Sequence, residues 1–228
     1  VLRLILFFIL LSFLSQYAGY AESPSDQDVI SQIFPAQIKG RLSKGKLREI
    51  LSNGGTVSGY VVPAKDLIDL IADKNFESAI KIESSVIEGT LDFTSLKPVS
   101  SVSLEGHPIK QWLEEREFQK CFVVKNQISM NNVTFVHRWE GSKDNRNSRY
   151  ESIRATKWLL QELIVFKNQV TPTVFLKPLN FDEVFFFGTV NIEHSAFLKR
   201  VAFRGVNFLS RVSLKGSQFF DRVDFIGD

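Results

Sequence analysis

The spacing of large apolar residues from Phe175 to Phe225 constrains the fold of this chain more than any other feature of its sequence. Successive members are alternately six and five residues apart, so the pattern repeats every eleven residues; they are Phe175, Phe181, Phe186, Ile192, Phe197, Phe203, Phe208, Leu214, Phe219 and Phe225. Most follow, by two positions, a small or β-branched residue: Val184, Val190, Ser195, Val201, Val206, Val212, Ser217 and Val223. Glycine occurs two positions after some of them, at Gly205, Gly216 and Gly227. Such regular spacing describes a repetitive fold rather than an activity.

The eleven-residue period predicts a β-solenoid. A helical repeat of eleven residues exists, but Val-x-Phe triplets followed by glycine favour short extended segments joined by turns. Residues two apart in an extended chain face the same side, so both apolar residues of a triplet are expected to point inward. The 21 Phe residues, against 4 Tyr and 3 Trp, suit stacked interior positions because a buried Tyr or Trp needs a polar partner. We therefore expect a mainly β fold in which each coil buries its apolar side on the next.

Three segments of this repeat resemble the pentapeptide-repeat family. The units 201–205 (VAFRG), 212–216 (VSLKG) and 223–227 (VDFIG) are similar to its consensus of a small residue, a polar residue, Leu or Phe, a polar residue and Gly. The resemblance covers residues 175–228 and implies a right-handed quadrilateral β-helix, with the Phe or Leu and the small residue filling the interior. Every second unit has six residues and the unit 195–199 lacks the glycine, so the implied coil is distorted.

The same spacing occurs earlier in two fragments, which places the start of the repetitive core near residue 80. The fragments contain Ile82, Ile87 and Phe93, and then Val124, Met130 and Phe135. We therefore expect the solenoid over residues 81–228, with excursions at 94–117 and 136–174. The second excursion includes a predicted helical insertion from Tyr150 to Phe166, because its apolar residues recur at helical spacing.

Residues 22–80 are predicted to form a small helical N-terminal cap and an entry segment into the coil. Short amphipathic helices are expected at Val29–Phe34, at Leu47–Leu51 before a glycine pair, and after Pro63. A strand is expected within Thr56–Val62. The third helix should bury one apolar face, made by Leu67, Ile68, Leu70 and Ile71.

The N-terminal sequence is typical of an export signal. Leu4–Leu14 is almost wholly apolar and precedes small residues that suit cleavage after Ala21. We therefore predict a signal peptide at residues 1–21 and an exported protein, which is periplasmic, secreted or associated with the cell envelope. The alternative is an uncleaved anchor in which residues 1–17 contact the membrane, although the apolar run is short for a bilayer span. Cys121 is the only cysteine, so no intrachain disulfide is expected.

No catalytic, cofactor-binding or metal-binding residues are predicted. His107, His137 and His194 lie far apart and lack the partner spacing of a zinc site. The sequence has no phosphate-binding glycine loop and no Gly-x-Ser-x-Gly elbow. The net charge of +3 is a weak excess, so we predict no nucleic-acid partner and no acidic imitation of DNA. Because glycosidase carboxylates come from distant positions in a sequence, a carbohydrate-active β-helix enzyme stays open as an alternative.

Six residues are candidates for interaction with a partner: Phe185, Phe187, Phe220, Lys143, Arg146 and Arg149. The three phenylalanines adjoin inward positions and should point outward, where either the predicted helix at 150–166 or a partner would cover them. The three basic residues form a loop before that helix, which is either solvated or suited to an anionic lipid or polymer. The repeat also reaches Phe225 without a polar closing unit, so we expect further coil or end-to-end pairing with another chain there.

The sequence therefore favours a non-catalytic extracytoplasmic scaffold, or a protein- or ligand-binding module, with an unidentified protein or cell-envelope partner. The first alternative is an accessory or sensory domain of a membrane protein or channel, which the resemblance to some pentapeptide-repeat proteins implies. The second alternative is the carbohydrate-active enzyme, which would place a cluster of carboxylates along one face of the solenoid.

Overall fold

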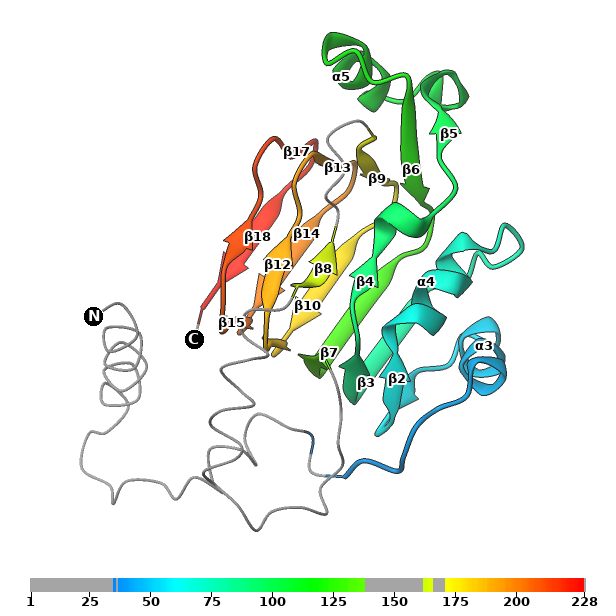
Figure 1. The fold of residues 1–228 in the computed structure, drawn as a ribbon, viewed down its shortest axis with the longest axis vertical. Coiled ribbons are helices and arrows are strands. Elements are labelled where there is room, and N and C mark those ends of the chain that lie inside the picture. The colour runs from blue at the N-terminus through cyan, green and yellow to red at the C-terminus, as the bar shows by residue number, and fades with distance from the viewer. Residues whose placement is uncertain (1–34, 36, 138–161, 166–170, 228) are drawn as a thin grey trace, which may run out of the picture. The chain divides into compact units, whose positions relative to one another are not determined.

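The computed structural model describes residues 35, 37–137, 162–165 and 171–227, which all belong to one unit of the chain, Phe34–Asp228. The predicted signal peptide, the helix expected at Val29–Phe34 and the predicted basic loop lie outside the described residues. The described part is mainly β with few helices, and its strands pair almost entirely in parallel (Figure 1).

Two short helices occur where their apolar spacing predicts them. Helix α3 (Lys44–Ser52) begins after Ser43, whose hydroxyl accepts a hydrogen bond from the backbone N–H of Lys46. Its buried residues are Leu47 and Leu51. These contacts hold the helix against the first strands.

Helix α4 (Ala64–Ala72) follows Pro63 directly, and the fixed φ of that residue suits the start of a helix. Its buried residues include all four that the sequence predicts, Leu67, Ile68, Leu70 and Ile71. The strand expected before α4 is present as two pieces, β1 (Val57–Ser58) and β2 (Val61–Pro63).

The main strands lie in four columns, within which neighbours pair in parallel. Columns 1 and 2 share one sheet, because β3 (Ile80–Glu88) and β7 (Ile128–Val136) run through both. Column 1 also contains β1, β10 (Leu179–Asp182), β14 (Val201–Arg204) and β18 (Val223–Ile226). Column 2 also contains β2, β11 (Phe185–Phe186) and β15 (Asn207–Phe208).

The other two columns form separate sheets. Column 3 consists of β4 (Leu91–Asp92), β8 (Glu162–Val165), β12 (Thr189–Asn191) and β16 (Val212–Ser213). Column 4 consists of β6 (Lys120–Val124), β9 (Thr173–Phe175), β13 (Ser195–Phe197) and β17 (Gln218–Phe219). The short β5 (Val99–Ser100) extends column 4 by pairing antiparallel to β6.

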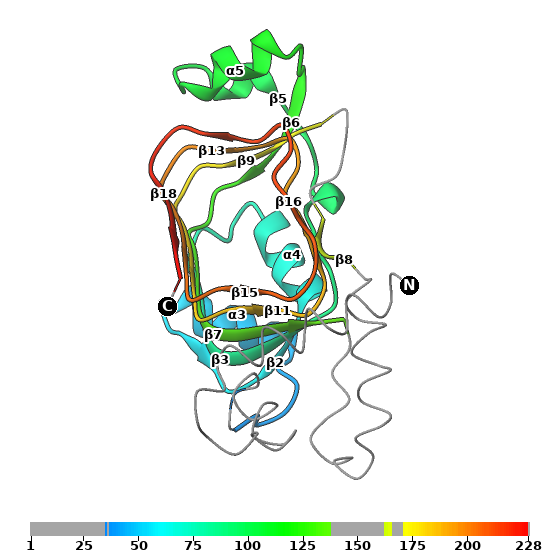
Figure 2. The ribbon, with the colours of Figure 1, turned by 90° about the vertical axis from the view of Figure 1, so that its left-hand side faces the viewer.

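One rung, meaning one passage of the chain through all four columns, contains 22 residues, because Val201 pairs with Val223 and Phe197 with Phe219. The eleven-residue sequence period is therefore half a rung, and each side chain stacks on the one two periods later. Figure 2 shows the rungs nested one behind another around a common interior. This arrangement is compatible with the β-helix solenoid that the sequence predicts.

The interior contains stacked phenylalanine rings from successive rungs. Phe197 lies between Phe175 and Phe219, with ring centroids 5.0 and 4.8 Å away and interplanar angles of 11° and 9°. Phe203 lies in the same way between Phe181 and Phe225, at 5.5 and 4.9 Å. These distances match the spacing of hydrogen-bonded strands, so the backbone repeat sets the ring stack.

The two early fragments belong to the same lattice, as their spacing predicts. Ile82 pairs with Met130, which pairs with Phe181. Helices α3 and α4 share one apolar core with the coil. Parallel pairing also occurs before residue 81: β1 pairs with β3, and an isolated parallel bridge joins Arg41 to Val61.

The tight corner between columns 1 and 2 has the same backbone conformation in every described rung before the last. The residues at this corner have positive φ: Gly59 (77°), Ser84 (42°), Asn132 (50°), Glu183 (51°) and Gly205 (55°). The corner between columns 3 and 4 repeats the feature at His194 (51°) and Gly216 (70°). Positive φ at Gly205 and Gly216 agrees with the turn role expected of these glycines.

The excursions differ from expectation in content. The first contains η1 (Phe93–Ser95), β5, η2 (Ser101–Leu104) and α5 (Ile109–Glu115). The second contains β8, so the predicted helix Tyr150–Phe166 is wrong at its C-terminal end, and the remainder lies outside the described residues. The cause is lattice pairing: Ile164 pairs with Leu91 on one side and Val190 on the other, and this outweighs a helical pattern of apolar residues.

Candidate interaction surfaces

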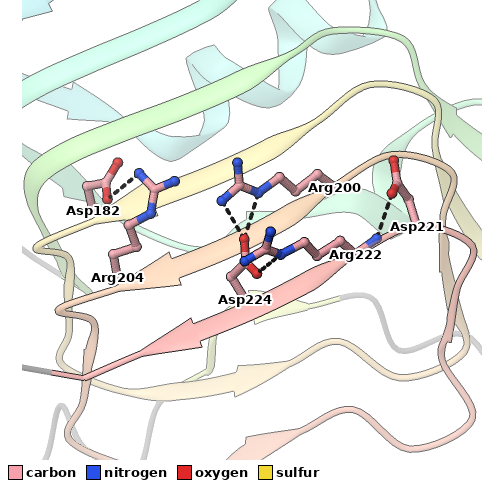
Figure 3. A network of polar contacts seen from close by, with 6 residues as sticks. All are labelled: Asp182, Arg200, Arg204, Asp221, Arg222 and Asp224. Atoms are coloured by element: carbon pink, nitrogen blue, oxygen red, sulfur yellow. Dashed lines mark hydrogen bonds and ion pairs between the residues drawn. The ribbon is translucent and has the colours of Figure 1, made fainter.

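An arginine–aspartate network covers the outer face of β10, β14 and β18, and its members are Asp182, Arg200, Arg204, Asp221, Arg222 and Asp224 (Figure 3). Asp224 lies at its centre and its side chain is only 6% exposed. Arg200 donates from Nε to Asp224 Oδ2 at 2.7 Å, and Arg222 pairs with the other carboxylate oxygen. The network therefore ties β18 to the residue preceding β14.

The charge of Asp224 is stabilised where it lies. Burial of the carboxylate acts to raise its pKa, but hydrogen bonds from Arg222 and Arg200, with their positive charge, outweigh burial and hold the pKa below its usual value. An ionised, doubly paired carboxylate acts as an anchor. A general acid of a glycosidase needs the opposite perturbation, a raised pKa.

A second ion pair of the network joins the neighbouring strands β10 and β14. Arg204 donates to Asp182 at 3.5 Å, and these two residues are direct partners in the register of β14 and β10. The side chains of Arg200, Arg204 and Arg222 are 40%, 41% and 70% exposed. Three partly exposed guanidinium groups thus lie on the outer face of one sheet.

The predicted outward residue Phe220 lies on the outer side of column 4, where a second apolar core covers the earlier rungs. That core contains Leu104, Ile109, Trp112, Leu113, Cys121, Val174 and Ala196, with Leu176 and Leu198 packed against it. The backbone N–H of Leu198 donates to Phe175 O and that of Phe220 to Phe197 O, so the two residues occupy equivalent positions in successive rungs. Phe220 is 36% exposed. The excursion with α5 therefore covers this wall as far as Leu198, in a place where the sequence suggested the helix 150–166.

Phe185 and Phe187 lie on the outer side of column 2 and are both half-buried. Phe185 pairs with Thr134 and Asn207. Phe187 packs against a small apolar cluster that includes Val61, Val86, Val136 and Ile38. The chain's own N-terminal part thus covers some of this surface. Phe185 and Phe187 belong to one wall and Phe220 to another, so the three predicted residues do not form a single patch.

The remaining interaction candidates, Lys143, Arg146 and Arg149, lie outside the described residues. Cys121 is buried beneath the excursion with α5, and burial raises the pKa of its thiol to about 11. Such a thiol is almost wholly protonated at neutral pH and is a poor nucleophile.

One void inside the described part of the coil has a volume of about 30 Å³, too small for a ligand of ordinary size. Its lining is apolar and includes Met130, Phe175 and Phe197. A void of this size and polarity is expected to stay dry. Across the described residues, no three His, Cys, Asp or Glu side chains group closely enough to hold a metal ion. Within that same part of the chain, no helix combines the length and apolar character needed to cross a membrane.

Sequence reasoning missed the arginine–aspartate network and the core beneath α5. The signal for the first was the separation of Asp182 and Arg204 by one full rung, which becomes visible only when the 22-residue repeat is known. The signal for the second was the helical spacing of Ile109, Trp112 and Leu113 inside a polar excursion. Comparison with known proteins adds no relative: no family model, curated protein or solved structure matches the chain.

Proposed function

We propose that this chain is a non-catalytic scaffold or binding module, built on a right-handed quadrilateral β-helix of the pentapeptide-repeat type. The 22-residue rung supports this form, because it divides into four units that each place an apolar residue inward. The observation that carries the function is the arginine–aspartate network. It presents three partly exposed guanidinium groups at fixed positions on a sheet whose interior is closed by stacked rings.

The proposed partner is a protein or cell-envelope component that presents carboxylates. Arg204 and Arg222 are the groups best placed to reach it, since each is paired on one side only and remains 41% and 70% exposed. Charge-assisted hydrogen bonds from arginine favour carboxylates in a planar, paired geometry. The lowered pKa of Asp224 supports an anchoring role for that carboxylate and makes it unsuited to act as the general acid of a glycosidase.

Cross-linking of the chain in its native cell, followed by mass spectrometry, tests this proposal. The double variant Arg204→Gln/Arg222→Gln should lose a cross-linked partner that the unmodified chain captures. The matched control is Arg48→Gln, since Arg48 is 44% exposed and also pairs with an aspartate, but on α3. Equal capture by all three proteins would contradict the proposed surface. Turnover of a glycan that is abolished by one carboxylate substitution would contradict the non-catalytic assignment.

Export is the proposed location, supported by the apolar run Leu4–Leu14 and the small residues that follow it. Mass spectrometry of the mature N-terminus in separated cell fractions tests it. Cleavage after Ala21 with recovery in a soluble exported fraction would support a free scaffold. An intact Leu4–Leu14 run in the membrane fraction would favour the alternative function, an accessory or sensory domain of a membrane protein.

A further inference from the structure

One column of the coil has smaller inward residues than the other three. Val190 pairs with Val212, so Ile192 and Leu214, each two residues later, occupy equivalent inward places of column 3 in successive rungs. The large inward residues of columns 1, 2 and 4 in the same rungs are all phenylalanine: Phe181 and Phe203, Phe186 and Phe208, and Phe197 and Phe219. Because Ile and Leu side chains are smaller than a phenylalanine ring, the interior is filled less completely beside column 3.

A void lies at that place. Its lining includes Ile192 and Leu214 together with rings from columns 1 and 4: Phe175, Phe181, Phe197, Phe203 and Phe219. The rings of column 2, Phe186 and Phe208, are not part of the lining. All lining residues except Leu214 and Phe219 are buried, and none of these is more than 7% exposed. The smaller residues of column 3 therefore account for the position of the void.

The void suits an apolar molecule of very small size. Its volume is about 30 Å³, whereas a single water needs about 10–15 Å³. Its lining is wholly apolar, and a buried water needs about two to four polar partners. Water therefore fits by size but finds no hydrogen bond there. An apolar occupant gains dispersion contacts with ring faces that have no partner while the void is empty.

We infer that this void is a binding site for a small apolar molecule of about two heavy atoms, of the class that includes dioxygen, dinitrogen and xenon. The occupant lies between Ile192 and the rings of Phe181 and Phe197, and dispersion contacts alone hold it. Larger ligands are excluded by size and polar ones by the lining. This inference goes beyond the proposed scaffold function and does not depend on it.

Xenon is the probe that tests this site, and Met130 is the reporter. Met130 lines the void and is the only methionine in the sequence. A carbon-13 label on the methionine methyl group therefore gives one NMR signal from inside the coil. As the xenon pressure rises, this signal is expected to shift along a saturating curve in the whole 228-residue chain. The absence of a shift, or a shift that stays linear with pressure, would overturn the inference.

The variant Ile192→Phe and a matched control separate the void from other effects of xenon. Ile192→Phe places a ring where the neighbouring columns already have one, so it should fill the void and abolish the saturating shift. Ile226→Phe makes the same change at a side chain that is 48% exposed, and it should leave the shift as it is in the unmodified chain. Circular dichroism verifies that both variants fold.

Leu214→Phe is a second filling variant, since overpacking at the buried Ile192 can prevent folding. Leu214 lines the same void but is only half-buried, so an added ring is accommodated more easily there. Loss of the saturating shift in a folded filling variant supports the inference. A shift that persists in a folded filling variant, or an equal loss in Ile226→Phe, would overturn it. None of these outcomes bears on the Arg204/Arg222 capture experiment.

Discussion

The substitution Phe197→Ala tests the ring stack that the described core depends on. Phe197 is 2% exposed and its ring stacks on those of Phe175 and Phe219, with centroid distances of 5.0 and 4.8 Å. The plane of its ring lies within 11° of both neighbouring rings. The substitution removes a fully buried ring from the centre of one stack and leaves an apolar cavity beside a void that already exists. Both rung boundaries that meet at β13 lose contacts.

The expected cost is large compared with the stability of a domain. Buried Phe→Ala substitutions cost about 3–5 kcal/mol, and each offset-stacked pair contributes about 0.5–1.5 kcal/mol beyond area burial. Because Phe197 takes part in two such pairs, we expect the upper part of the range, about 4–5 kcal/mol. Phe197→Leu keeps most of the volume and loses only the two stacks, so it should cost about 1–3 kcal/mol.

Urea unfolding followed by far-UV circular dichroism measures these differences at one protein concentration. Phe220→Ala is the matched control, because Phe220 adjoins a stacked ring but is 36% exposed on the outer wall. We expect it to cost less than about 1.5 kcal/mol, since only part of its area leaves water. A larger loss for Phe220→Ala than for Phe197→Ala would refute the assignment of inward and outward positions. A changed slope in urea would indicate that rungs unfold separately.

Four further predictions concern the corners, the network and the buried thiol. Gly216→Ala should lower the free energy of unfolding in urea by about 1–3 kcal/mol, because Gly216 has φ +70° and a Cβ there would lie 2.7 Å from Nδ1 of His194. Adding His194→Ala to this variant should restore part of the lost stability. Glu183→Gly should raise the free energy of unfolding by up to about 1 kcal/mol, because Glu183 has φ 51° and glycine relieves the strain while increasing the entropy of the unfolded chain. Asp224→Asn should lower the free energy of unfolding at neutral pH. Because the folded pKa of Asp224 lies below its unfolded value of about 4, the difference in unfolding free energy between the variant and the unmodified chain should vanish as pH falls through the folded pKa. A difference independent of pH would contradict the ion pairs. The Cys121 thiol, with a pKa of about 11, should resist Ellman's reagent at pH 8 until the chain is unfolded in urea, and prompt modification would contradict its burial.

The inward positions could be predicted from sequence because the lattice is local. A residue such as Phe203 is defined by its distance along the chain from Phe197 and Phe208, and no knowledge of distant segments is needed. The same reasoning located the early fragment around Met130 and helix α4, which has its own apolar periodicity. It failed at β8, where the neighbours in the sheet and not the local pattern decide the conformation.

The outer surface was much less predictable, since an outward residue is defined by what lies across the rung boundary. Asp224 meets Arg200 only because 24 residues of chain return it to the same wall. In the same way, the cover over Val174 and Ala196 comes from an excursion that leaves the coil at Phe93. To predict such contacts, the number of residues in one rung must be known. An eleven-residue period does not decide this number, because the period can be half a rung or a whole one.

From Phe175 to Phe225, the alternating spacing of five and six residues matches two kinds of corner, and this match also explains an apparent defect in the repeat. Where anchors are five residues apart, the chain turns within one residue, and that residue takes positive φ whether it is Gly205 (55°) or Glu183 (51°). Between Phe175 and Phe225, no residue has positive φ where the anchors are six residues apart. Lys199, in the unit without glycine, follows Phe197 at such a six-residue corner and is not among the positive-φ residues. Its unit therefore needs no glycine, and the alternation of tight and wide corners is what the sequence encodes.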